Sequence, residues 1–197
     1  MKVTSLIVAI FGLMSISIAQ NNGSDSSYWS NNKIMKGGFF LDGNLGYMRM
    51  KSERYYAYEK QTYYYKNEGL GVGVNIGQKI YFGQSETHRH GISISGGFDI
   101  YMNQLDFFDH EFVLSPLNLG FTNIFKTSST QAIEVNLNSG PVLSATQRRL
   151  AIKINPEVRF RMKRLTLGLG YSYDLPITNS YYKVLSTHRV NLIIGIR

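Results

Sequence analysis

The sequence contains no cysteine, only 4 prolines, a single tryptophan and 17% charged residues among its 197 positions. The absence of cysteine excludes disulfide scaffolds, cysteine-ligated zinc, iron–sulfur clusters and thiol nucleophiles. With 43% hydrophobic residues and so few charges, the chain is also unlike an intrinsically disordered protein. It does have 19 glycines and 14 tyrosines. This composition, poor in proline, favours an all-β protein over a helical one.

The first 36 residues are expected to precede the folded domain. Lys2 is followed by an apolar stretch, Leu6 to Ile18, and then by the small residue Ala19. This pattern predicts a secretory signal peptide over residues 1–19, and a retained N-terminal anchor is the alternative. Residues 20–36, which begin with a polar, Ser- and Asn-rich run, are predicted to be a flexible periplasmic lead-in to a domain over residues 37–197.

From Gly37 onward, apolar and polar residues alternate with the period of β-strands, and no long stretch has helical spacing. The alternating segments are 39–47, 69–82, 92–103, 117–122, 133–138, 150–162, 165–174 and 189–196. Many approach the 9 to 11 residues that a tilted strand needs to cross a bilayer, and an even number of strands returns both ends to one side. The pattern therefore predicts about eight strands.

Two architectures share this alternation, and they differ in which face points inward. The polar faces here are rich in Gly, Ser and Asn, as expected for a narrow interior, and aromatic residues gather at strand ends, with Tyr47, Tyr101 and Tyr171 at one rim and Tyr81 and Phe125 at the other. The polar faces also carry charges of both signs that can pair inside a lumen. This predicted lumen network consists of Asp42, Lys79, Asp99, Glu134, Lys153, Glu157, Arg159, Arg161, Asp174 and Arg189.

Three segments make the chain resemble the small eight-stranded outer-membrane barrels of the OmpA transmembrane domain, OmpX and opacity-protein type. They are GLGVGVNIG at residues 69–77, LTLGLGYSYDL at 165–175 and HRVNLIIGIR at 188–197. Such barrels typically end in an aromatic residue, whereas this sequence ends Ile196-Arg197. The resemblance implies an antiparallel up-and-down transmembrane barrel with a polar, side-chain-filled lumen. It also implies a monomer in the bacterial outer membrane, with a periplasmic N-terminus, insertion by the barrel-assembly machinery, and surrounding lipid and lipopolysaccharide.

The connections predicted to face outward, including 54–62 and 104–110, are rich in aromatic residues. Tyrosines in loops on a rigid scaffold can bind extracellular proteins or glycans, and they can equally anchor the rim in lipid headgroups. The candidate contact residues are Tyr55, Tyr56, Tyr58, Tyr63, Phe107, Phe108, Tyr181 and Tyr182.

Few residues suggest chemistry. Ser186 and His188 share the lipid-facing parity of the last strand with Glu53 of the first, so an esterase triad acting on lipid is one hypothesis, similar to outer-membrane lipid A deacylases. His88 and His90 could share a metal but have no third ligand nearby. We therefore expect no cofactor and no metal, and export argues against a nucleic-acid partner despite the net charge of +8.

The sequence thus predicts a non-enzymatic outer-membrane barrel for surface interaction or envelope integrity. The alternatives are a lipid A esterase and a soluble secreted barrel that binds an apolar ligand. About eight strands enclose a filled interior, so structural pairing of the lumen charges is expected and a small-solute or ion leak is the alternative. Bulges are expected at Pro116, Pro141 and Pro156, with slips of the alternation near Pro116 and Pro141, because proline removes a ladder donor.

Overall fold

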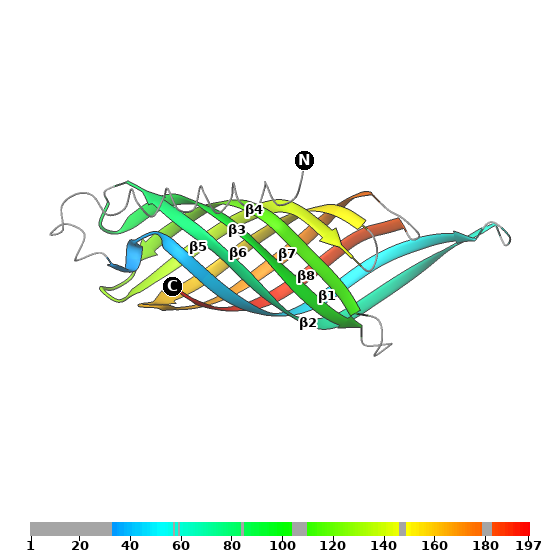
Figure 1. Ribbon diagram of the computed structural model, residues 1–197, viewed down its shortest axis with the longest axis horizontal. Helices are drawn as coiled ribbons and strands as arrows, with labels where there is room; N and C mark the ends of the chain where they lie inside the picture. Colours follow the sequence, from blue (N-terminus) through cyan, green and yellow to red (C-terminus); the bar gives the residue numbers. More distant parts are fainter. Residues whose placement is uncertain are drawn as a thin grey trace, which may run out of the picture. The chain divides into compact units, whose positions relative to one another are not determined.

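The computed structural model describes residues 33–56, 58, 60–83, 85–103, 110–145, 149–178 and 183–197. They form a closed barrel of antiparallel strands in which each strand pairs with its neighbours in sequence and the first closes on the last (Figure 1). The strands are β1 (Gly38–Tyr56), β2 (Gln61–Phe82), β3 (His88–Asn103), β4 (His110–Lys126), β5 (Gln131–Ser144), β6 (Arg149–Met162), β7 (Leu165–Thr178) and β8 (Lys183–Ile196). The predicted fold class is confirmed. The predicted signal peptide lies outside the described residues.

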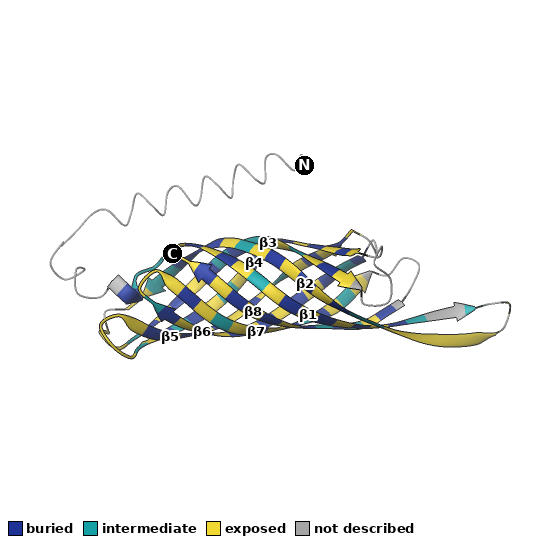
Figure 2. Ribbon diagram, turned by 90° about the horizontal axis from the view of Figure 1, so that it is seen from below, coloured by how far each residue is buried: buried dark blue, intermediate teal, exposed yellow. Residues whose placement is uncertain are grey.

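The barrel is apolar outside and polar inside. Along β5, Glu134 and Asn136 are each 1% exposed, whereas Ile133, Val135 and Leu137 between and beside them are 40 to 51% exposed. The same alternation of buried and exposed residues runs along the other strands, as the alternating dark blue and yellow segments in Figure 2 show. A soluble ligand-binding barrel requires an apolar interior. These strands enclose a polar one, so that alternative is wrong.

In the described part of the chain, no helix has the length and apolar character needed to cross a membrane.

Glycines on the inner face of β2 leave space for large side chains on β3. A Cβ atom at Gly71 would lie 2.6 Å from the carbonyl oxygen of Ile100 and 2.7 Å from Cγ of Tyr101, and one at Gly73 would collide with the carboxylate of Asp99. The alternating glycines of residues 69–77 are thus explained by crowding in a narrow lumen.

A bulge in β4 lies at one of the three prolines for which it was predicted. The β4–β5 register shifts between Leu114 and Leu119, and the inward alternation slips around Pro116. At Pro141, the same β4–β5 shift spans the proline on the β5 side, but the predicted slip of the alternation is wrong. The bulge expected at Pro156 is wrong, because the β5–β6 register runs through it without a shift. Both side chains face outward on strands whose alternation is unbroken.

The residues just before β1 close one end of the lumen. The short 3₁₀ turn η1 (Lys33–Met35) carries Ile34 and Met35, which are 3% and 0% exposed and pack against Ile124, Ala132 and Tyr81. The end of the segment predicted to be a flexible lead-in, residues 20–36, is therefore ordered. Two apolar side chains are enough to fix it, because they leave water for an enclosed mouth of the barrel.

The hairpin of β1 and β2 extends well beyond the rest of the barrel (Figures 1 and 2). β1 and β2 pair with each other as far as Tyr56 and Gln61, whereas the pairing of β1 with β8 ends at Glu53 and the described pairing of β2 with β3 ends at Gly69. Part of the predicted outer loop at 54–62 is therefore paired strand.

Candidate functional site

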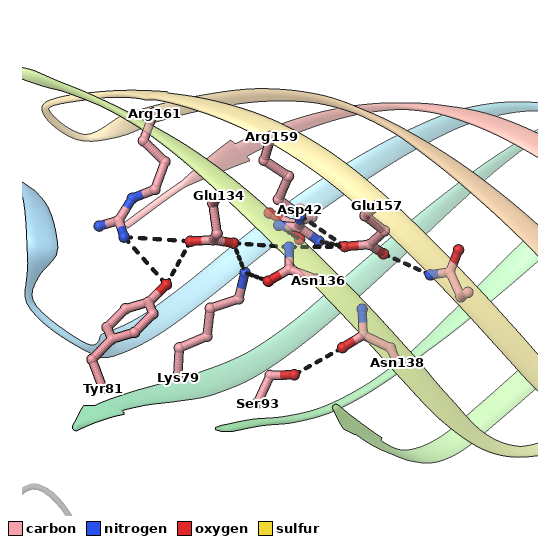
Figure 3. Close-up of polar contacts among 11 residues, drawn as sticks. Asp42, Lys79, Tyr81, Ser93, Glu134, Asn136, Asn138, Glu157, Arg159 and Arg161 are labelled. Carbon is pink, nitrogen blue, oxygen red and sulfur yellow. Dashed lines mark hydrogen bonds and ion pairs between the residues drawn. The ribbon is translucent and has the colours of Figure 1, made fainter. Parts of the chain in front are cut away.

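Glu134 is the centre of a charged cluster near the end of the lumen that Ile34 and Met35 close (Figure 3). One carboxylate oxygen pairs with the ammonium group of Lys79 and accepts a hydrogen bond from the amide of Asn136 at 2.9 Å. The other accepts hydrogen bonds from Tyr81 at 2.6 Å and from Arg161 at 3.3 Å. Three strands, β2, β5 and β6, thus contribute to one buried carboxylate.

Arg159 links this cluster to the opposite wall. Its guanidinium pairs with Asp42 at 2.6 Å and with Glu157 at 2.7 Å. Lys79 and Arg159 both lie over the ring of Phe40. The ring centroid is 5.1 Å from Nζ of Lys79 and 5.6 Å from Cζ of Arg159. The aromatic face therefore offsets part of the repulsion between two buried positive charges.

A second charged cluster lies toward the extended hairpin. Arg189 donates two hydrogen bonds to Asp174, at 2.8 and 2.5 Å. Arg149 lies 3.6 Å from the same carboxylate and 3.3 Å from Glu111. The Arg189 guanidinium also lies 5.5 Å from the centre of the Tyr101 ring. A bidentate contact between arginine and a carboxylate, such as that of Arg189 with Asp174, is a strong form of ion pair.

Between the two clusters lies a polar cavity of about 20 Å³. Asp99, Lys153 and Glu157 line it, and the Lys153 ammonium donates to Ser115 at 3.0 Å. A volume of this size holds about one water molecule. Side chains therefore fill this part of the lumen, between the two charged clusters.

All ten residues of the predicted lumen network lie on the inner face of the barrel, nine of them buried and Asp99 partly buried. Four further members were missed. Glu111 and Arg149 lie outside the alternating segments predicted from the sequence, yet both are buried in the lumen. Tyr81 and Tyr101 were predicted at the two rims, which is wrong because both rings point inward onto arginines.

The three residues of the esterase hypothesis lie on the neighbouring strands β1 and β8, but they do not form a triad. His188 Nδ1 is 2.6 Å from the hydroxyl of Tyr171, and the rings of His188 and Tyr173 lie 5.0 Å apart. Among the described residues, Ser186 and His188 share no hydrogen bond, and Glu53 pairs in register with Lys183. The ring nitrogen that a triad carboxylate must bind therefore faces a phenol.

The hairpin carries a cluster of tyrosines. The hydroxyls of Tyr56 and Tyr65 lie 3.1 Å apart, and the rings of Tyr56 and Tyr63 meet edge to face at 5.3 Å. Tyr58 is fully exposed and Tyr64 is 74% exposed. Of the other candidate contact residues, the side chain of Tyr55 and the whole of Phe107, Phe108, Tyr181 and Tyr182 lie outside the described residues.

His88 and His90 lie on one outward face at the opposite end of the barrel, with their rings 4.3 Å apart. His88 stacks on Phe125, and His90 Nδ1 lies 2.6 Å from Oδ1 of Asn123. Across the described residues, no group of three or more potential metal ligands comes together. These histidines are thus accounted for by aromatic and amide contacts.

Comparison with known proteins identifies an architecture. No protein-family model matches the sequence, and no curated protein matches it. Among solved structures, the outer membrane enzyme PagL superposes with a TM-score of 0.57 at 10% identity, covering 80% of this chain and 99% of PagL. Neisserial surface protein A matches with a TM-score of 0.44 at 12% identity over 81% of this chain and 96% of its own. The chain has the fold of a small outer-membrane β-barrel. Identity this low shows the fold alone.

Replacing Glu134 tests whether the lumen network stabilises the barrel. Glu134→Gln leaves Lys79 and Arg161 buried beside a neutral amide, so the free energy of unfolding should fall by about 3–5 kcal/mol. Urea unfolding in lipid vesicles, followed by circular dichroism, measures the loss.

The matched control for this variant is Glu68→Gln, which breaks solvent-exposed ion pairs on the outer wall and should cost far less stability than Glu134→Gln. The pair of changes Lys79→Met and Glu134→Leu should recover only part of the loss, because Arg161 still lacks its carboxylate. Equal losses for Glu134→Gln and Glu68→Gln would contradict a stabilising role of the buried cluster.

Proposed function

We propose that the protein is a non-enzymatic barrel of the bacterial outer membrane that presents the β1–β2 hairpin outside the cell as a contact surface for a protein or glycan. The observation that carries the proposal is the exposed tyrosine cluster at the end of the paired β1–β2 hairpin, beyond the lipid-facing wall. The barrel holds the hairpin, and the filled lumen leaves contact rather than transport as its role.

The position of the tip favours contact over rim anchoring. On β1 the last aromatic residue of the lipid-facing wall is Tyr47, and Tyr56 follows nine residues later. At about 3.3 Å per residue and a tilt of about 40°, the tip stands roughly 20 Å above Tyr47. The headgroup region on each side of a bilayer is only about 5–8 Å thick. Tyr47 and Tyr171 therefore suit the rim, and Tyr58 and Tyr64 suit a partner beyond it.

Tyrosine also suits the proposed task chemically. The side chain offers a large apolar ring with only two rotatable angles, and its hydroxyl can donate or accept a hydrogen bond. In the hairpin, Tyr56 orders its neighbours Tyr63 and Tyr65 through the ring and hydroxyl contacts described above. A partner would thus meet a partly pre-formed surface.

The two ends of the barrel support this orientation. The end with Ile34 and Arg197 has short connections, such as Lys163-Arg164 between β6 and β7, whereas the hairpin extends from the other end. Short turns are typical of the periplasmic side. The outer membrane also fits the apolar outer wall and the fold shared with PagL. We propose insertion by the barrel-assembly machinery after export through the signal peptide, and a monomer, because a closed barrel has no free edge within the membrane.

Because the sequence has no cysteine, single introduced thiols report the orientation directly. Tyr58→Cys places a thiol at the hairpin tip, and Ser129→Cys places one in the exposed turn between β4 and β5. A membrane-impermeant maleimide should label the first on intact cells and the second only after the outer membrane is permeabilised. The reverse pattern would place the hairpin in the periplasm.

The contact role is tested by removing the exposed rings. Tyr58→Ser combined with Tyr64→Ser should lower binding to the ligands that the wild-type protein retains on arrays of glycans and extracellular proteins by at least about tenfold, because aromatic anchors dominate contact energies. Thr62→Ser, on the same hairpin, is the control and should bind normally. The proposal fails if wild-type and the double variant give the same array profile.

The absence of enzymatic activity has its own test. Cells that produce Ser186→Ala or His188→Ala protein should contain lipid A with the same acyl chains as cells that produce the wild type, because His188 faces Tyr171 and no triad is assembled. Mass spectrometry of extracted lipid A measures the acyl chains. A chain lost in the wild type and retained in both variants would establish the esterase instead.

A further inference from the structure

Three cations gather on the outer wall where the hairpin leaves the barrel. Arg49 and Lys51 lie on β1, and the register pairs Lys51 with Lys66 of β2. On the other side of β1, Arg49 lies opposite His188 and Lys51 lies opposite Ser186. We call Arg49, Lys51 and Lys66 the basic patch.

The side chains of the basic patch point away from the lumen. The neighbours that alternate with them on β1, Met48, Met50 and Ser52, are buried on the inner face. Arg49 and Lys66 have side chains 46% and 50% exposed. Directly opposed residues of an antiparallel pair share one face, so Lys66 projects from the same wall as Lys51.

The basic patch is not neutralised by its surroundings. Glu68, the carboxylate in the row of Arg49, lies 3.4 Å from Arg49 and 2.5 Å from Lys66. Lys51 forms no ion pair with any described residue, and it stands directly across from a second lysine. Like charges at such a position destabilise a strand pair. Glu53 lies two residues beyond Lys51 on the same face, and the register places it opposite Lys183. Counted with Glu68 alone, the three cations of the patch keep an excess of about two positive charges, which an anion would offset.

The height of the basic patch matches lipid phosphate. The row nearer the barrel centre holds Tyr47 and Val190, and Tyr171 lies beyond Val190 on β7. Arg49 is two residues past Tyr47 and Lys51 is four, which places them about 5 and 10 Å above that aromatic row. Flexible cationic side chains at this depth reach the headgroup layer.

We propose that the basic patch binds the phosphomonoester of a phosphorylated glycolipid of the outer leaflet, with the Ser186 hydroxyl as a neutral donor beside it. A phosphomonoester carries between one and two negative charges at pH 7, close to the unmatched charge of the patch, whereas a phosphodiester carries one. This assignment rests on the proposed function, because it needs the hairpin end to lie in the outer leaflet. It gives the lipid a fixed place at the base of the hairpin.

Native mass spectrometry of the purified barrel in neutral detergent tests the assignment, with lipid A carrying both phosphates and the same lipid A after removal of the phosphates as probes. The wild type should retain the phosphorylated lipid more tightly. Lys51→Gln combined with Lys66→Gln should reduce this preference about thirtyfold, the weight of two cations at a phosphate surface. Lys163→Gln combined with Arg164→Gln, which removes two exposed cations at the other end, should keep it.

Both double variants change exposed residues, and an unheated gel verifies that each is folded. Equal retention of both lipids by the wild type, or an unchanged preference in the patch variant, would overturn the assignment. Inorganic phosphate that displaces the lipid at equal concentration would also overturn it, since the site would then select a free ion. If the lipid experiment fails while Tyr58→Cys is labelled on intact cells as expected, only the lipid site is contradicted. Reversed labelling would contradict the proposed orientation.

Discussion

The whole structure depends on pairing charge inside a barrel whose outer wall is apolar. The strands place Leu, Ile and Val outward, so the charges on alternate residues have no direction but inward. A buried charge without a partner costs several kcal/mol. A typical domain is stable by only about 5–15 kcal/mol, so it cannot tolerate several such charges. Glu134 with Lys79, and Asp174 with Arg189, are therefore conditions of the fold.

The same pairs connect walls that are distant in sequence. Arg159 of β6 reaches Asp42 of β1, which is 117 residues away, and Lys79 of β2 reaches Glu134 of β5. Backbone ladders join only neighbouring strands, so these side chains are the links across the diameter. They join these walls near the end of the lumen that Ile34 and Met35 close, at the opposite end from the hairpin.

The sequence predicted which face of each strand points inward, because hydrophobic alternation and membrane insertion obey the same period of two. It could not assign residues whose chemistry suits both sides. The ring of Tyr81 fits a bilayer rim, and its hydroxyl fits a lumen carboxylate, so only the fold decides between them. Arg149 lies at a strand end, where a polar residue reads as loop, and only the barrel register brings it to Asp174. The hairpin escaped prediction for the same reason, since Tyr55 and Tyr56 have the composition of a surface loop but a paired backbone.

The small cavity between the two charged clusters has an electrical consequence. An ion that moved along the axis would have to displace the Asp174–Arg189 pair, rest where there is space for about one water molecule, and then displace Lys79 from Glu134 before it met the apolar side chains of Ile34 and Met35. Within the described residues, ion movement along this axis would therefore require the separation of charged pairs on both sides of the cavity.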